Sequence, residues 1–184
     1  MGARPCRRRH ERAGGQAGDG STGADGRGLR LTMENRTLSP PLHADAIPEG
    51  FVPAHHGGPY ARELGPFWSR PGDAHVSLGL RLQHRHCNSA GAAHGGFIAT
   101  LADLGLIHAV AVMRERKGLP RHALTTVSLT TDYLAPAPEG CWLEVRAEVS
   151  RLGRNLCFTE GVMLADGKRV ARVSAVMAVL GPRD

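Results

Sequence analysis

The segment that most constrains the fold is residues 97–113, which is almost entirely apolar and contains one carboxylate, Asp103. Its apolar side chains are distributed around the whole circumference of a 3.6-residue helix, so the pattern predicts a helix enclosed on nearly all sides. The segment is shorter than the roughly 20 residues that span a bilayer. We therefore expect a core helix, not a membrane span, that begins near Gly95 or Gly96 and ends by Gly118.

Asp103 is the unusual residue of this helix, because burying an ionised carboxylate without partners costs several kcal/mol. One interpretation is a carboxylate that reaches the rim of the core and pairs there. The other is a general base or a nucleophile. The second is favoured by the glycine pair Gly95-Gly96, whose backbone N–H groups at a helix start favour an anion. An oxyanion site and a base on one helix suit acyl transfer.

The residues around this helix carry a recognisable pattern. The motif His86-x-Asn88-x-x-Gly91-x-x-His94-Gly95-Gly96, followed by Asp103, resembles the signature of hotdog-fold acyl-CoA thioesterases of the phenylacetate-degradation type. Residues 125–137 are similar to the strand that follows the helix in that family. The resemblance extends over residues 60–181 and does not include residues 1–45.

The resemblance implies an α+β hotdog fold, in which an antiparallel sheet curls around the long helix. It implies hydrolysis of the thioester of a small, aromatic or fatty acyl-CoA to the free acid and CoA. Coenzyme A would then be part of the substrate, and no separate cofactor is expected. Hotdog proteins pair strands across a dimer, so we expect an obligate homodimer, with a homotetramer as the alternative. In such dimers the carboxylate of one subunit works with the loop of the other, so the resemblance implies that dimerisation assembles the site.

The resemblance also assigns roles to the residues of the motif. The backbone N–H of Gly95 would donate to the thioester oxygen, and Asn88 would bind or orient the carbonyl or the water. His94 would either take part in the chemistry or only shape the loop. Asp103 would activate water or attack directly, and sequence does not separate these routes. Thr126 would position the water, although threonine is also simply a good strand former.

The remaining predictions for the site concern coenzyme A. Arg151 and Arg154 flank a turn and could contact its phosphates, and Arg116 and Lys117 at the end of the helix are further candidates. Solvated arginines at turns are common, however. Two alternatives to a thioesterase stay open. One is a non-catalytic acyl-CoA-binding protein of the same fold. The other is a hotdog hydratase, whose chemistry resembles an Asp and His pair on a different loop pattern.

Alternating apolar residues predict five strands around the helix. They are residues 76–82, 122–134, 141–151, 156–164 and 169–180, with a tight hairpin turn at 165–168. In the Thr-rich strand 122–134, period two places Val127, Leu129 and Tyr133 on one face and Thr126 on the other. This strand carries little charge and would be a poor free edge, so it should pair with a second subunit. No β-α-β alternation occurs, which excludes a parallel Rossmann sheet.

The N-terminal part of the chain differs in composition. Residues 1–32 contain eight glycines and seven arginines against three acidic residues, so they supply +4 of the net charge of +6. We expect 1–45 to be a disordered tail and extended arm, and 46–184 to be one domain. The simplest hypothesis is that translation starts at Met33. The domain is then nearly neutral and poor in aromatics, so a nucleic-acid partner is not expected.

Cysteine and histidine positions bear on compartment and metals. The four cysteines form no C-x-x-C pair and follow no secretory leader, which predicts a reduced, cytoplasmic location without a membrane partner. The pairs His55-His56 and His84-x-His86 have no further ligand at usable spacing, so no metal is expected. A structural role for His86, bonded to loop carbonyls, is the preferred interpretation.

Overall fold

The structure is a computed structural model that describes residues 46–55 and 57–182. The predicted tail at 1–45 and His56 lie outside the described residues. Along the chain the elements are β1 (Val52–Ala54), α1 (Gly58–Leu64), β2 (Phe67–Pro71), β3 (Val76–Arg81), a 3-10 turn η1 (His84–His86), α2 (Gly95–Arg116), β4 (His122–Tyr133), β5 (Trp142–Leu152), β6 (Leu156–Ala165) and β7 (Lys168–Pro182).

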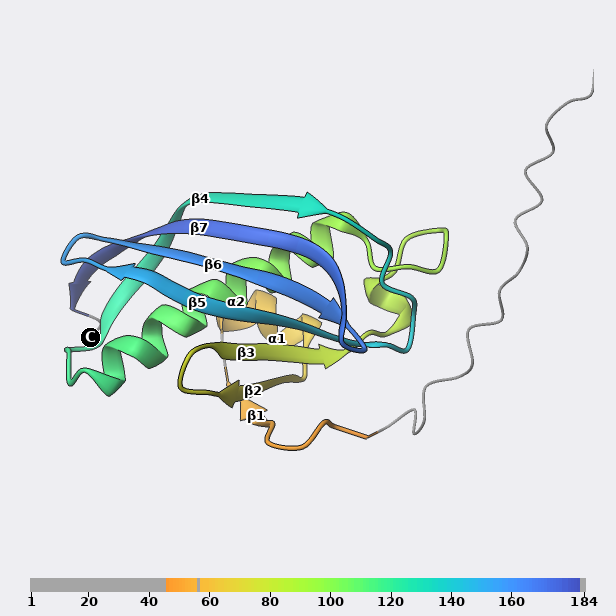
Figure 1. The fold of residues 1–184 in the computed structure, drawn as a ribbon, viewed down its shortest axis with the longest axis horizontal. Coiled ribbons are helices and arrows are strands. Elements are labelled where there is room, and N and C mark those ends of the chain that lie inside the picture. The colour runs from red at the N-terminus through yellow and green to blue at the C-terminus, as the bar shows by residue number, and fades with distance from the viewer. Residues whose placement is uncertain (1–45, 56, 183–184) are drawn as a thin grey trace, which may run out of the picture. The chain divides into compact units, whose positions relative to one another are not determined.

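The strands form one seven-stranded antiparallel sheet in the order β1-β2-β3-β5-β6-β7-β4. The sheet curves over α2, as Figure 1 shows. This arrangement confirms the α+β class and the expected antiparallel sheet around a long helix. All five predicted strands are present, and a short helix, α1, precedes β2. The two N-terminal strands β1 and β2 were missed, because their short, proline-containing sequences have little alternation.

The predicted turn at 165–168 closes the hairpin between β6 and β7. Asp166 and Gly167 both have positive φ angles, of 46° and 79°, which is the backbone of a type I′ turn. Ala165 and Lys168 are the pair that flanks it. The Asp-Gly sequence therefore sets the register of two strands that lie in the middle of the sheet.

Helix α2 is long and apolar enough to cross a membrane by length and composition, yet it is the core helix of this sheet. Leu101 and Leu106 are fully buried, and Gly105 faces β5 so closely that an added Cβ would lie 2.0 Å from Cγ1 of Val145. The side of α2 that faces the sheet is therefore in direct van der Waals contact with it. This glycine allows the close approach of helix and sheet.

The prediction that α2 is enclosed on nearly all sides was wrong. A stripe at helical spacing is only partly buried or is exposed, and we call it the open stripe. It consists of Gly96, Thr100, Asp103, Ile107 and Ala111. The side chains at these positions are small or moderately apolar, so composition around the helix did not distinguish the open stripe from the buried side.

The predicted face of Thr126 in β4 was also wrong, because the strand contains a β-bulge. The register of β4 against β7 shifts between Thr126 and Ser128, which leaves Val127 as the extra residue. Val127 is 60% exposed, whereas Thr126 points toward α2, as Leu129 does beyond the bulge. Simple period two fails at a bulge, since one inserted residue exchanges the two faces of the strand.

Candidate functional site

The open stripe of α2 brings a carboxylate to the edge strand of the sheet. Oγ1 of Thr126 donates a hydrogen bond of 2.5 Å to Oδ1 of Asp103. Asp103 is half-buried, so its second oxygen is not sealed into the core. Two of the residues predicted for the site are thus in contact. The bulge at Val127 is what aims the Thr126 hydroxyl at the helix.

The start of α2 is held by contacts from two directions. His94 is the N-cap, and its Nδ1 accepts a hydrogen bond of 3.0 Å from the N–H of Gly96. Tyr133, at the end of β4, donates its hydroxyl to the carbonyl oxygen of Gly95 at 2.9 Å. The peptide between Gly95 and Gly96 is therefore fixed at both its carbonyl and its N–H.

Two N–H groups at the helix start have no partner in the described part of the chain, namely those of Gly95 and Phe97. A helix leaves its first N–H groups without intrahelical acceptors, and the helix dipole adds positive potential there. His94 uses the neighbouring N–H of Gly96 for capping. The N–H of Gly95, at the first position of the helix, is thus unpaired, and its role as the donor to an oxyanion stays a prediction.

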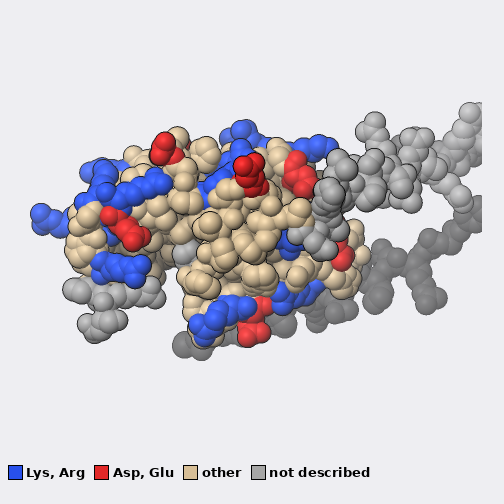
Figure 2. Space-filling view, turned by 90° about the horizontal axis from the view of Figure 1, so that it is seen from below, with Lys and Arg blue, Asp and Glu red and all other residues tan. Residues whose placement is uncertain are grey.

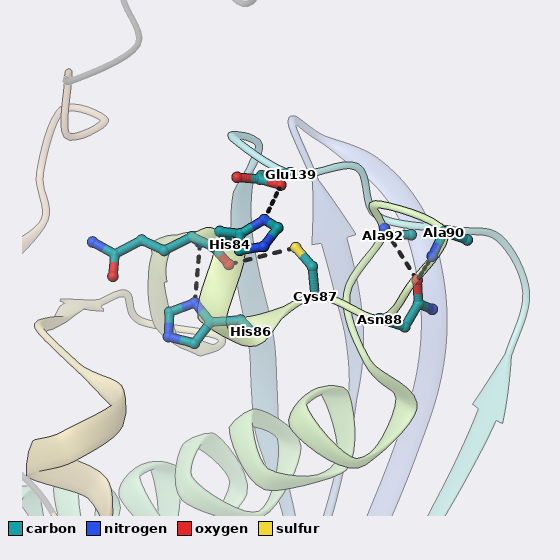
Figure 3. A network of polar contacts seen from close by, with 8 residues as sticks. His84, His86, Cys87, Asn88, Ala90, Ala92 and Glu139 are labelled. Carbon is teal, nitrogen blue, oxygen red and sulfur yellow. Dashed lines mark hydrogen bonds and ion pairs between the residues drawn. The ribbon is translucent and has the colours of Figure 1, made fainter.

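Asn88 lies in the loop that precedes α2, and Figure 3 shows how its side chain folds back on that loop. Its Oδ1 accepts hydrogen bonds from the N–H groups of Ala90 at 2.9 Å and Ala92 at 3.3 Å. The carbonyl end of the amide is thereby used inside the chain. The NH₂ end of this exposed side chain stays free to donate to a substrate oxygen.

His86 is a structural residue of the same loop, as predicted. Its Nδ1 accepts from the N–H of Gln83 at 3.1 Å, and its Nε2 donates to the carbonyl of Leu64 at 3.0 Å. The ring stacks on Phe97 of α2, with 4.2 Å between centroids. Burial lowers the pKa of His86, and the nearby Arg85 lowers it further, against the hydrogen bond to Leu64. The neutral imidazole thus links α1, the loop and α2.

His84 and His86 lie beyond the end of the strand, in the 3-10 turn η1. Strand β3 ends at Arg81, and η1 turns the two rings in different directions. The His84 side chain is 92% exposed and contacts Glu139 at 3.1 Å, while His86 is buried (Figure 3). Among residues 46–55 and 57–182, no group of three or more His, Cys, Asp or Glu side chains is placed to hold a metal ion.

The two halves of the candidate site are separated along α2. Gly95 and Asp103 are eight residues apart, which corresponds to about 12 Å along the helix axis. One thioester carbonyl cannot contact both residues of the same subunit. Gly95 and Asp103 of one chain therefore do not form a complete site, and the roles predicted for them stay predictions.

The arginines predicted for coenzyme A lie apart from the pair Asp103–Thr126. Arg151 and Arg154 are exposed, at the end of β5 and in the turn before β6. Thr126 is aligned across β7 and β6 with Leu152, and three strand spacings amount to about 14 Å. The structure does not bring these arginines to the carboxylate. Their role in binding phosphate stays a prediction.

Tyr133 is a residue of the site that sequence reasoning did not single out. It is 55% exposed, and its ring atoms lie 3.6 Å from the position of a Cβ on Gly95. A polar aromatic residue at the end of an edge strand was the only signal in the sequence. Its contact with Gly95 depends on how β4 crosses the start of α2, which the local pattern does not reveal.

Comparison with known proteins agrees with this architecture. Residues 90–171 match the model of the thioesterase superfamily. The chain is 40% identical over 132 residues to the protein named "Putative esterase PA0474" of Pseudomonas aeruginosa, a match that covers 71% of this chain and 95% of that protein. The chain belongs to the thioesterase superfamily. Human acyl-coenzyme A thioesterase 13 is 30% identical over 95 residues, covering 50% of this chain and 64% of the human protein.

Solved structures of the thioesterase superfamily share the fold. The phenylacetic acid degradation protein PaaI of Thermus thermophilus, in a mutant form, aligns with a TM-score of 0.54 at 25% identity, over 66% of this chain and 99% of that one. Zebrafish thioesterase superfamily member 2 aligns with a TM-score of 0.57 at 24% identity, over 68% and 88%. The antiparallel sheet around α2 is the hotdog fold of these thioesterases.

Proposed function

We propose that this thioesterase hydrolyses the thioester of an acyl-CoA to the free acid and coenzyme A. The observation that carries the proposal is the contact between Thr126 and Asp103 on the open stripe of α2. A half-buried carboxylate, oriented by a hydroxyl group and still open on one oxygen, is a suitable base or nucleophile. The similarity to acyl-coenzyme A thioesterase 13 supports CoA as the thiol part of the substrate.

In the proposed reaction, the oxygen of water attacks the thioester carbonyl carbon. Asp103 accepts the proton of that water, the C–S bond breaks, and the proton passes to the departing thiolate. Thr126 donates to Oδ1 of Asp103 and so keeps Oδ2 directed at the water. Direct attack by Asp103 would form an anhydride that water then hydrolyses. Both routes use the same two side chains.

The carbonyl oxygen gains negative charge in either route, and the N–H of Gly95 is the proposed donor to it. Because Gly95 lies about 12 Å from Asp103 in the same chain, the Gly95 that acts with a given Asp103 would come from a second subunit. Strand β4 is the sheet edge next to Asp103 and exposes Val127. Pairing of β4 between two copies would join the two half-sites, and association of dimers into a tetramer is the larger alternative.

Asn88 and His94 have supporting roles in this proposal. The free NH₂ group of Asn88 would donate to the carbonyl or orient the water, while its Oδ1 keeps the loop in shape. His94 already accepts from Gly96 through Nδ1, so we propose that it shapes the helix start and leaves the chemistry to Asp103. Burial raises the pKa of Cys141 to about 12 and that of Cys87 above its usual range, which makes these two thiols poor nucleophiles.

The test is the release of free thiol from a panel of aliphatic and aromatic acyl-CoAs by the parent protein and by Asp103→Asn. The change keeps the size of the side chain and removes its charge. We expect kcat to fall roughly 10²- to 10⁴-fold, the usual contribution of a general base. Asp132→Asn is the control, because Asp132 is an exposed carboxylate that pairs with Arg172 on the outer face of β4.

Full activity of Asp103→Asn would overturn the mechanism. Binding of acyl-CoA by the parent without turnover would instead support a non-catalytic acyl-CoA-binding protein. The dimer has its own measurement, because sedimentation of the parent should show a dimer or tetramer at all practical concentrations. A stable, active monomer would contradict the shared site.

A further inference from the structure

A groove lies at the end of α2, away from Gly95, and it is not used by the proposed chemistry. Its volume is about 630 Å³, and it lies between the last turn of α2, the loop that follows and the first residues of β4. Figure 2 shows Lys and Arg side chains gathered at this end of the domain, on the left. The groove is lined by His55, Ala111, Arg114, Glu115, Gly118, Leu119, Pro120, Arg121, His122 and Leu124.

Arg114 is the unusual residue of the groove. It is only 7% exposed, its Nη2 donates to the carbonyl of Pro120 at 3.1 Å, and its Nε is buried without a hydrogen-bond partner. In the described part of the chain no carboxylate lies within ion-pair distance of it. A buried guanidinium normally has a counter-charge, because removing it from water is costly. The described residues therefore supply no counter-charge for this guanidinium, which is the pattern of an anion site.

The other charged groups of the groove favour an anion overall. Arg121 adds a second permanent positive charge, and the rings of His55 and His122 add further donors. Glu115 is the one acidic residue in the lining, and it is exposed. A guanidinium that still has free donors in a fixed plane suits phosphate or carboxylate oxygens. The expected ligand group is therefore an oxyanion of one of these two kinds.

The groove is connected to the proposed catalytic pair along two elements. Ala111 belongs both to the groove and to the open stripe of α2 that carries Asp103. Leu124 and His122 precede Thr126 on β4. Arg114 is 11 residues beyond Asp103, about 16 Å along the helix axis, and His122 is about 13 Å from Thr126 along the strand. The groove therefore adjoins the side of α2 that carries Asp103.

We infer that this groove binds a phosphate group of the coenzyme A part of the substrate through Arg114 and Arg121. The inference rests on the proposed thioesterase function, which it deepens by assigning one end of the substrate. The flexible pantetheine arm separates the thioester from the phosphates of CoA over a distance of this order. A carboxylate at the far end of a long acyl chain is the other source of an oxyanion, and it would have to be fully extended to reach Arg114.

Calorimetric binding tests the inference without catalysis. The probes are coenzyme A, 3′-dephospho-coenzyme A and pantetheine, and the proteins are the parent, Arg114→Met and Arg121→Gln. We expect the Kd of coenzyme A to rise roughly tenfold for each variant, the effect of losing one charge-assisted hydrogen bond. The weak binding of pantetheine should not change. Arg116→Gln is the matched control, since Arg116 is an arginine of the same helix that donates to Gly72 and does not line the groove.

Kinetics with paired substrates separates the two sources of the oxyanion. For a neutral acyl-CoA, Arg114→Met should raise KM about tenfold with little change in kcat, and the same acyl group on pantetheine should show no difference between parent and variant. A variant effect only with acyl-CoAs that end in a carboxylate would overturn the phosphate assignment. An unchanged Kd for coenzyme A in both Arg114→Met and Arg121→Gln would also overturn it. So would an equal loss of affinity for coenzyme A in Arg154→Gln and Arg114→Met.

Two further readouts keep the result interpretable. Methionine has a similar volume to the buried part of arginine, so the unliganded Arg114→Met protein should unfold at or near the temperature of the parent. If Arg114→Met does not fold, the same binding and kinetic measurements on Arg121→Gln test the phosphate site, because Arg121 is exposed and its substitution should not affect folding. If hydrolysis of acyl-CoA does not depend on Arg114, the groove is not the phosphate site, and the proposed thioesterase activity is still supported. Arginine-dependent binding of coenzyme A without hydrolysis would support the groove and refute the proposed activity.

Discussion

The two sides of helix α2 have similar apolar character in sequence and different surroundings in the structure. The side that faces the sheet is packed without space, with Leu101 and Leu106 fully buried and Gly105 against Val145. The open stripe carries Asp103 and ends at the groove beside Arg114. One helix thus supports the core with one side and carries the proposed catalytic carboxylate on the other. Substitutions on the two sides should therefore affect different measurements.

The largest expected effect on stability belongs to the buried side. Leu106→Ala should lower the free energy of unfolding by roughly 2–5 kcal/mol, because it leaves a cavity in a close-packed core. Ile107→Ala, the adjacent residue on the open stripe, removes a similar side chain that is only half-buried and should cost about 1 kcal/mol. Denaturant unfolding measures both variants. An equal loss of unfolding free energy in the two variants would contradict the distinction between the buried side of α2 and the open stripe.

Two glycines of α2 give a sharper contrast. Gly105→Ala should lower the free energy of unfolding by about 1–3 kcal/mol, because the new Cβ would overlap the stiff side chain of Val145. In Gly95→Ala the new Cβ would only make ordinary contact with Tyr133, so stability should hold or rise slightly.

The activity of the same two variants should show the opposite order. We expect kcat/KM to fall roughly tenfold or more in Gly95→Ala, if a thioester oxygen must approach that N–H closely. Folded Gly105→Ala should keep the parent value. Thermal unfolding and steady-state kinetics on the same preparations provide the comparison, and a fully active Gly95→Ala would count against the oxyanion role.

The Thr126 hydroxyl should show a smaller effect on rate. Thr126→Val keeps the shape and the strand propensity but removes the donor to Asp103, so kcat should fall about tenfold with little change in stability. Thr126→Ser should recover most of the activity. Thr130→Val provides the control, since Thr130 is exposed and lies opposite Ser174 on β7. An equal loss in the control would point to a general effect on β4.

The smallest effect is a dependence of stability on pH at the start of α2. Because the pKa of His86 is lowered in the folded protein, the unfolded chain binds this proton at higher pH than the folded chain does. The free energy of unfolding should therefore fall as pH drops below the ordinary value of 6.5, and it should be recovered as pH rises. His86→Gln should flatten this slope in denaturant titrations across that range. An unchanged slope would show that other groups cause it.

Local signals in the sequence determined the class of fold and most of its elements. The apolar segment marked α2, alternation marked β3 to β7, and Asp166-Gly167 marked the turn between the last two strands. The family resemblance of the glycine loop and Asp103 implied thioester chemistry. These features depend on residues close together in the chain, where propensity and periodicity act directly.

Tertiary structure decided how the candidate site is arranged. The bulge at Val127 turned Thr126 toward Asp103, against the simple alternation of the strand. The open stripe was distinguished only by where the sheet ends, and Arg114 became a buried charge only because the following loop covers it. Each of these outcomes depends on residues that meet across the fold. The periodicity of a helix or a strand does not specify which residues of other elements its side chains will contact.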